Sequence, residues 1–279
     1  MAPVIVRKVY EYNVFYEFSL IQQSLSRFRF ASLDTEFPGT IYDAEGVPPH
    51  LQARLSPEAF YAVMKQNVDA LNLIQLGLTL SDSEGNLPTL GTRYQYVWEF
   101  NFRDFDYESD LHDPEAITML ERQGMDFPKN KRMGIDSSCF AVLFRFSGLC
   151  FASYGKVTWV TFHGPYDFGY LIKILTGGDL PGDIDVFLDL VREFFGPAVY
   201  DVKSMIRFFG LYGGLERVAR SLKLERVAGK SHQAGSDSLL TMHVFLSLRE
   251  LCLIHNLAGN KITGMRKFNH KVYGLTFVR

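Results

Sequence analysis

The sequence predicts a mixed α/β fold, in which helices pack on a β-sheet, and two observations lead to this prediction. Strand-like segments come early in the chain in the order of a meander, and helix-like and strand-like segments alternate after them. Hydrophobic residues make up 47% of the 279 residues and aromatic residues 14%, enough for a substantial core. Because no linker, repeat or low-complexity segment divides the chain, we expect a single domain over residues 1–279, with its core at about 10–275.

Three helices are predicted in the first half of the chain. Asn13 can cap a helix over residues 14–25, whose apolar residues recur at helical spacing. Ser56-Pro57-Glu58 begins a helix that extends to residue 71, because proline is favoured at the first helical position. Asp113-Pro114-Glu115 begins a third helix in the same way, and Gly124 can end it.

Three strands separate these helices. Residues 28–37 and 74–80 read as strands, and residues 94–102 alternate aromatic and polar side chains as a second hairpin arm would. The turn between the hairpin arms lies at residues 83–86. Residues 39–54 contain glycine and proline, and we expect a loop there, close to the end of the first strand.

The second half of the chain predicts alternating strands and helices. The strands are expected at residues 157–163 and 198–202, and the helices at residues 166–175, 184–195, 215–222 and 236–253. Acids at Asp179, Asp183, Asp185 and Asp189 surround the start of the helix at 184–195, where negative charge stabilises a helix N-terminus.

Cysteine usage and charge restrict the class of protein. The three cysteines, Cys139, Cys150 and Cys252, lie in apolar stretches without a Cys-x-x-Cys motif, which indicates buried thiols in a reducing compartment. No run of 18 apolar residues occurs, so neither secretion nor a membrane span is expected. A net charge of -2 argues against coating nucleic acid by bulk electrostatics. The basic segment after Glu250 is either a solvated tail or a phosphate contact.

Four carboxylates and one histidine form the candidate site. Asp34-Thr35-Glu36 ends a buried strand, and side chains at i and i+2 of a strand point to the same face, so Asp34 and Glu36 can share a pocket while Thr35 points away. Asp167 follows a later strand, and His232 precedes Asp237 by five residues. Two Mg²⁺ or Mn²⁺ ions need such carboxylates, so this set is suited to two-metal phosphodiester cleavage.

Each of these residues also has a structural interpretation when taken alone. Asp167 could cap a helix, and Asp237 beside Ser236 could stabilise a helix dipole. His232 could be a surface or hydrogen-bonded histidine. The order acid-x-acid, acid, His-x-x-x-x-acid favours a nuclease over these separate explanations.

The sequence around these residues resembles the DEDDh exonucleases, and within them the Pop/Caf-type deadenylase subunit of the Ccr-Not complex. The matching blocks are Asp34-Thr35-Glu36-Phe37-Pro38-Gly39, Asn67-Val68-Asp69, Ile74-Gln75-Leu76-Gly77-Leu78-Thr79, Tyr166-Asp167-Phe168-Gly169-Tyr170-Leu171, Tyr200-Asp201-Val202-Lys203 and His232-Gln233-Ala234-Gly235-Ser236-Asp237-Ser238-Leu239-Leu240-Thr241. Residues 80–88 and 98–102 resemble the plant branch of that family.

The resemblance implies an RNase H-like mixed sheet and 3′ to 5′ hydrolysis of mRNA poly(A) tails to 5′-AMP. Asp34 would bridge two divalent cations, Mg²⁺ or Mn²⁺, Glu36 and Asp237 would hold the ion on the nucleophile side, and Asp167 would support the other. His232 would accept the proton of the attacking water, since an unperturbed imidazole has a pKa of about 6.5. Phe37 is a candidate contact for the terminal nucleotide, although a core role is also open.

The implied partners are single-stranded poly(A) RNA, and the scaffold subunit and companion deadenylase of the Ccr-Not complex, with this chain as a monomeric catalytic subunit in cytoplasm and nucleus. The loop before the second acid departs from the family pattern His-Ser-Gly-Tyr-Asp, because it reads His163-Gly164-Pro165-Tyr166-Asp167 here. His163 is a further candidate for substrate binding.

Two other functions stay open at this point. The chain could be a scaffold or adapter subunit with little activity, although all four acids are present. It could also be a DEDDh exonuclease of broader RNA or DNA specificity, with the same acids.

Overall fold

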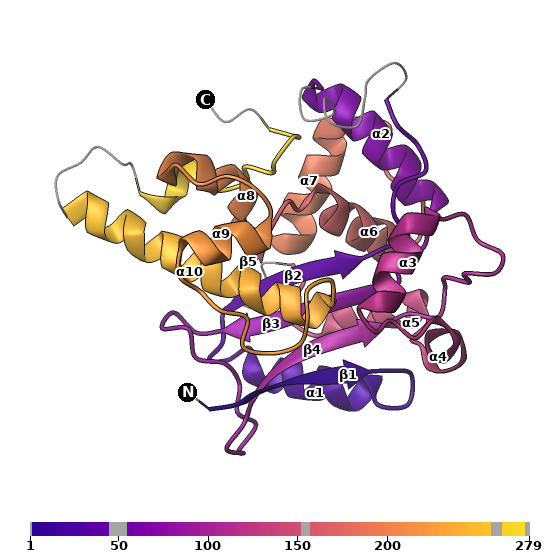
Figure 1. The fold of residues 1–279 in the computed structure, drawn as a ribbon, viewed down its shortest axis with the longest axis horizontal. Coiled ribbons are helices and arrows are strands. Elements are labelled where there is room, and N and C mark those ends of the chain that lie inside the picture. The colour runs from indigo at the N-terminus through magenta and orange to yellow at the C-terminus, as the bar shows by residue number, and fades with distance from the viewer. Residues whose placement is uncertain (1, 45–54, 152–156, 258–263, 277–279) are drawn as a thin grey trace.

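A six-stranded sheet forms the centre of the computed structural model, which describes residues 2–44, 55–151, 157–257 and 264–276 (Figure 1). The strands are β1 (Val4–Val9), β2 (Phe30–Glu36), β3 (Gln75–Ser81), β4 (Gln95–Asn101), β5 (Thr158–Thr161) and β6 (Val199–Asp201), in the spatial order β1-β4-β3-β2-β5-β6. Strands β2, β3 and β4 are antiparallel neighbours, whereas β1 joins β4, β5 joins β2 and β6 joins β5 in parallel. The predicted mixed sheet is confirmed.

Helices cover both faces of this sheet. One core cluster contains buried residues of α1 (Val14–Ser24), α2 (Pro57–Ala70), α5 (Ser137–Phe146), α6 (Pro165–Thr176) and α7 (Ile184–Phe195). A second cluster contains residues of α8 (Val202–Met205), η3 (Ile206–Phe209), α9 (Leu215–Ser221), α10 (Ala234–Leu257) and η4 (Met265–Phe268). Trp159 belongs to the first cluster and its neighbour Val160 to the second, because successive strand residues point to opposite faces.

Most of the predicted helices are found near their expected bounds, and their caps explain why. Helix α7 begins and ends as predicted, and the Asp183 carboxylate accepts hydrogen bonds from two backbone N–H groups of its first turn. Ser56 caps α2, and Asp113 caps α3 (Pro114–Arg122). The prediction for Asn13 is wrong in its detail: Asn13 stands before α1, but its side chain makes no capping bond and accepts from the Tyr10 backbone N–H instead.

Six of the described elements were not predicted, among them the short helices α8, η3 and η4. The segment of β1 has only a short apolar pattern, and it becomes an edge strand by pairing with β4, far along the chain. Helices α4 (Phe127–Met133) and α5 are capped by Asp126 and Asp136 in a region that the sequence left unassigned. The backbone partners of an edge strand depend on long-range pairing, which local periodicity does not report.

The start of α10 is held against the middle of the sheet, and this contact positions the site. Gly77 in β3 pairs with Asp34 in β2, and a Cβ at Gly77 would lie 1.9 Å from the Ala234 carbonyl oxygen. The Gln75 side-chain oxygen accepts a hydrogen bond of 3.0 Å from the Ala234 backbone N–H. A glycine at position 77 therefore lets the first turn of α10 approach the end of β2 closely.

The structure also places the cysteines and the basic C-terminal segment, for which the sequence made predictions. All three thiols are free, with Cys150 and Cys252 buried and Cys139 partly buried. Arg266 and Lys267 lie in η4, and the Lys267 ammonium contacts the rings of Phe208 and Phe268. This part of the segment therefore packs against the rest of the protein. Lys261 and Arg279 lie outside the described residues, as do residues 45–54 of the predicted loop.

Within the described part of the chain, no helix has both the length and the apolar character needed to cross a bilayer.

Candidate active site

The predicted site residues converge from three separate elements. Asp34 and Glu36 lie at the end of β2, Asp167 in the first turn of α6, and Asp237 in the first turn of α10. His232 precedes α10 and has a backbone φ of 56°. Ligand atoms of Glu36, His232 and Asp237 all lie within 4.8 Å of one another, which is compatible with a shared cation.

These residues open onto one cavity of about 600 Å³. Asp34, Glu36, His232 and Asp237 line it, whereas Asp167 is buried and lies behind the lining. The Thr35 hydroxyl donates a hydrogen bond of 2.6 Å to Asp167 Oδ1. Thr35 is itself among the residues that line the cavity, so the expectation that it points away from the pocket stays a prediction, and its hydroxyl orients Asp167.

The carboxylates repel one another in a poorly hydrated site. Desolvation, followed by the charges of Asp237 and Asp167, raises the pKa of Asp34 and Glu36 well above the usual range. Desolvation also raises the pKa of Asp167 to about 8, although the hydrogen bond from Thr35 lowers it. A cluster of acids that is costly to ionise has the donor chemistry for divalent cations, which offset the negative charge.

Asp167→Asn should stabilise the metal-free protein, and more so as the pH rises. An acid with a raised folded pKa keeps its proton when the unfolded chain has lost it, so the destabilisation grows from pH ~4 to pH ~8 and is absent at lower pH. Asparagine avoids this ionisation while still accepting the Thr35 hydrogen bond. Urea unfolding in EDTA should show a gain on the order of 3 kcal/mol at pH 8 and little gain at pH 4.

The exposed Asp189→Asn on α7 is the control for this series. Adding Mn²⁺ should stabilise the parent and reduce the difference, because a ligand stabilises only the state that binds it. A gain that is the same at both pH values would show that Asp167 ionises normally.

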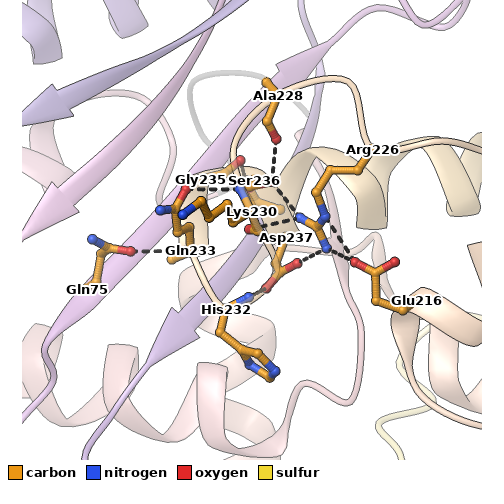
Figure 2. Close-up of polar contacts among 12 residues, drawn as sticks. Gln75, Glu216, Arg226, Ala228, Lys230, His232, Gln233, Gly235, Ser236 and Asp237 are labelled. Carbon is orange, nitrogen blue, oxygen red and sulfur yellow. Dashed lines mark hydrogen bonds and ion pairs between the residues drawn. The ribbon is translucent and has the colours of Figure 1, made fainter. Parts of the chain in front are cut away.

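Asp237 is held by a network that the sequence did not reveal (Figure 2). The half-buried Arg226 guanidinium donates to the carboxylates of Asp237 and Glu216 and to the Ser236 hydroxyl. The His232 backbone N–H donates a hydrogen bond of 2.8 Å to Asp237 Oδ2. Both Asp237 oxygens are therefore oriented, while the His232 imidazole is exposed and points away from Arg226 in Figure 2.

The two candidate substrate contacts are placed differently. Phe37 lines the cavity, and its ring stacks on Tyr166 at a centroid distance of 5.1 Å and also packs against Tyr170. Phe37 therefore packs against neighbouring rings while lining the cavity, and its contact with the terminal nucleotide stays a prediction. His163 is not among the described residues that line the cavity, and its ring meets Tyr273 edge-on. A substrate contact by His163 stays a prediction.

The unusual loop before Asp167 is built from backbone contacts. Gly164 precedes α6 and Pro165 is its first residue, a position where proline is favoured. The Gly164 N–H donates to the buried Asp201, and a Cβ at Gly164 would lie 2.2 Å from Thr161 Oγ1. The family serine at this position would collide with Thr161, so Gly164 suits this local packing.

Several cavity residues had no signal in the sequence. The rest of the lining consists of Thr35, Gly39, Ala116, Met119, Phe162, Gly214, Leu215, Glu216, Arg217, Arg220 and Ser231. Apart from Thr35 and Gly39, which belong to the motif after Asp34, they lie in segments that were interpreted without any role in the site. Arg226 precedes Asp237 by eleven residues, but nothing in that spacing indicates an ion pair.

Known sequences resemble most of this chain. The model of the CAF1 family ribonuclease matches residues 9–137. The probable CCR4-associated factor 1 homolog 7 of Arabidopsis thaliana is 43% identical over 272 residues, which cover 97% of this chain and 93% of the relative. The poly(A) ribonuclease pop2 of Schizosaccharomyces pombe is 38% identical over 245 residues, which cover 88% of this chain and 69% of the relative.

Solved structures agree with these sequences. The structure of S. pombe Pop2p in its Mg²⁺ and Mn²⁺ bound form has a TM-score of 0.83 at 35% identity, covering 97% of this chain and 99% of that chain. The yeast CAF1 structure with the NOT1 MIF4G domain has a TM-score of 0.74 at 32% identity, covering 96% of each chain. The RNase H-like fold and the resemblance to the Pop/Caf-type nucleases, plant branch included, are thereby confirmed. The chain belongs to the CAF1 family of ribonucleases.

Proposed function

We propose that this protein is a poly(A)-specific 3′ to 5′ exoribonuclease that shortens mRNA poly(A) tails and releases 5′-AMP. The observation that carries the proposal is the convergence of Asp34, Glu36, Asp237 and His232 at one cavity, with Asp167 buried behind its lining. The family relationship supports the substrate, since the S. pombe relative is named a poly(A) ribonuclease. Neither a silent adapter nor a broad-specificity exonuclease finds support in these comparisons.

Asp34, Glu36, Asp167 and Asp237 would hold two divalent cations, Mg²⁺ or Mn²⁺. Their oxygens are the hard donors that these ions prefer, and desolvation raises the pKa of all four acids, so a bound cation would favour their ionised form. When bound, such ions activate water and stabilise charge on the phosphate. The structure of the S. pombe relative with Mg²⁺ and Mn²⁺ supports the use of divalent ions in this family.

His232 would accept the proton of the attacking water. Its imidazole is exposed at the cavity and close to the oxygens of Glu36 and Asp237. The backbone bond from His232 to Asp237 holds the residue in place independently of its ring. A base that is anchored through its main chain can keep the imidazole free for proton transfer.

Single-stranded RNA with a 3′-terminal adenosine run should be shortened stepwise to 5′-AMP, faster than poly(U), poly(C), poly(G) or oligo(dA). Purines stack well on aromatic rings, which Phe37 offers at the cavity, and a 2′-hydroxyl distinguishes RNA from DNA. Initial rates on the four homopolymers and oligo(dA) at one salt concentration measure this preference. A 3′-phosphate or a duplex end should slow the reaction, and equal rates on all five substrates would indicate a general exonuclease.

We also propose that the chain works as the catalytic subunit beside a NOT1-type scaffold and a companion deadenylase. The yeast CAF1 relative was solved with a NOT1 domain. Helices α1 and α5 pack together and expose Phe15 and Phe146 to 67% and 80%, an apolar surface that suits a protein partner. Copurification of the chain with such a scaffold tests this proposal, and loss of binding in Phe146→Ser would locate the contact.

A further inference from the structure

One wall of the candidate active site is cationic. Arg217 and Arg220 of α9 line the same cavity as Asp34, Glu36 and His232, and both arginine side chains are exposed. Cationic side chains at the wall of a cavity attract anionic groups of a ligand, provided that they are not already paired with acids of the protein.

Within the described residues, neither arginine has an acidic partner. Glu216 stands four residues before Arg220, at the spacing where an acid and a base pair on a helix, but its carboxylate binds Arg226 instead. Among the residues that the structure describes, the Arg220 side chain makes a single hydrogen bond, a long one of 3.4 Å to the Glu216 carbonyl oxygen. The Arg226 network therefore leaves Arg217 and Arg220 available to a ligand.

Another part of the lining is apolar. Ala116 and Met119 of α3, together with Phe37, give it an apolar surface. An RNA strand can complement both parts of the lining. Its bases have apolar faces that match the apolar part, and each phosphate of its backbone bears a negative charge that matches the arginines.

We infer that Arg217 and Arg220 bind phosphates of the RNA strand on the 5′ side of the terminal nucleotide. This inference rests on the proposed function, since the four acids would engage the scissile phosphate through cations and thereby leave the arginines to the preceding phosphates. Arginine is suited to this role because its planar guanidinium binds phosphate oxygens in pairs. With a net charge of -2, the chain would hold its substrate through this local pair rather than through bulk electrostatic attraction.

The test compares the parent with a double variant, Arg217→Gln and Arg220→Gln, on oligo(A) and on the dinucleotide ApA. ApA contains only the scissile phosphate, so the loss of kcat/KM should be large on oligo(A) and much smaller on ApA. The slope of log(kcat/KM) against log[salt] should become shallower by about 0.7 for each lost phosphate contact, or ~1.4 in total. Lys223→Gln, just after the same helix but lining a different cavity, is the control for the loss of a nearby positive charge and should behave as the parent.

A binding measurement separates this inference from the proposed function. Oligo(A) with a 3′-phosphate, which should resist cleavage, can be labelled and titrated with each protein by fluorescence anisotropy in Mg²⁺. If the parent degrades RNA and the double variant matches it in rate, affinity and salt slope, the inference about the arginines is overturned and the proposed function stands. If the parent binds oligo(A) without cutting RNA and the double variant binds it more weakly, the proposed function is overturned and the phosphate contact is supported.

Discussion

Asp34→Asn should lower the rate of RNA hydrolysis by more than about 10³-fold while the protein stays folded, because bound metal supplies several kcal/mol of transition-state stabilisation and each 1.36 kcal/mol is tenfold in rate. Asp34 lies close enough to Asp237, Asp167 and Glu36 to interact with their charges, and this is the position expected for a carboxylate shared by two ions. A neutral amide cannot serve two divalent cations as a carboxylate does. Single-nucleotide resolution of labelled oligo(A) in Mg²⁺ measures the rate.

Titration calorimetry with Mn²⁺ links this loss to the metal. The variant should bind Mn²⁺ more weakly than the parent, whereas Asp189→Asn, an exposed acid on α7, should change neither rate nor affinity. Thermal unfolding in EDTA checks that Asp34→Asn is folded, and removing one member of a mutually repelling cluster should not destabilise it. Hydrolysis at the parent rate would refute the assignment of Asp34 as a metal ligand.

Removing the imidazole of His232 should lower kcat by about 10²–10⁴-fold, the usual contribution of a general base, with Mn²⁺ and RNA affinity retained. The backbone N–H of residue 232, and with it the bond to Asp237, survives any side-chain replacement except proline. The rate should therefore change without a change in metal occupancy. Single-turnover kinetics and Mn²⁺ calorimetry on the same preparations measure the two quantities.

The backbone of His232 determines which variant is informative. Its φ of 56° lies in the left-handed region, where asparagine is tolerated better than alanine, so His232→Asn limits the strain that His232→Ala adds. His270→Asn is the matched control, because His270 also has a positive φ, of 54°, and does not line the cavity. A normal rate in His232→Asn would exclude proton transfer by this imidazole, and weakened Mn²⁺ binding would indicate a ligand instead.

The sequence predicted those parts of the molecule that depend on neighbouring residues. Ser56-Pro57 and Asp113-Pro114 predicted helix starts because a cap and a following proline act within one turn. Asp34 and Glu36 were expected to share a face because strand residues alternate. By contrast, β1 was missed because its backbone pairs with β4, about 90 residues away, and such a contact leaves no local pattern.

The candidate site shows the same difference between features that depend on neighbouring residues and features that depend on long-range contacts. The sequence by itself determined which acids and which histidine the protein offers, because the chemistry of carboxylates and imidazole belongs to the residue type and the motif order is visible in the chain. Only the tertiary structure decided how they act together. Close packing of Ala234 on Gly77 brings α10 to β2, Thr35 orients Asp167, and Arg226 holds Asp237 while drawing Glu216 away from Arg220. These are contacts between separate elements, and their geometry follows from sheet register and helix packing rather than from spacing in the sequence.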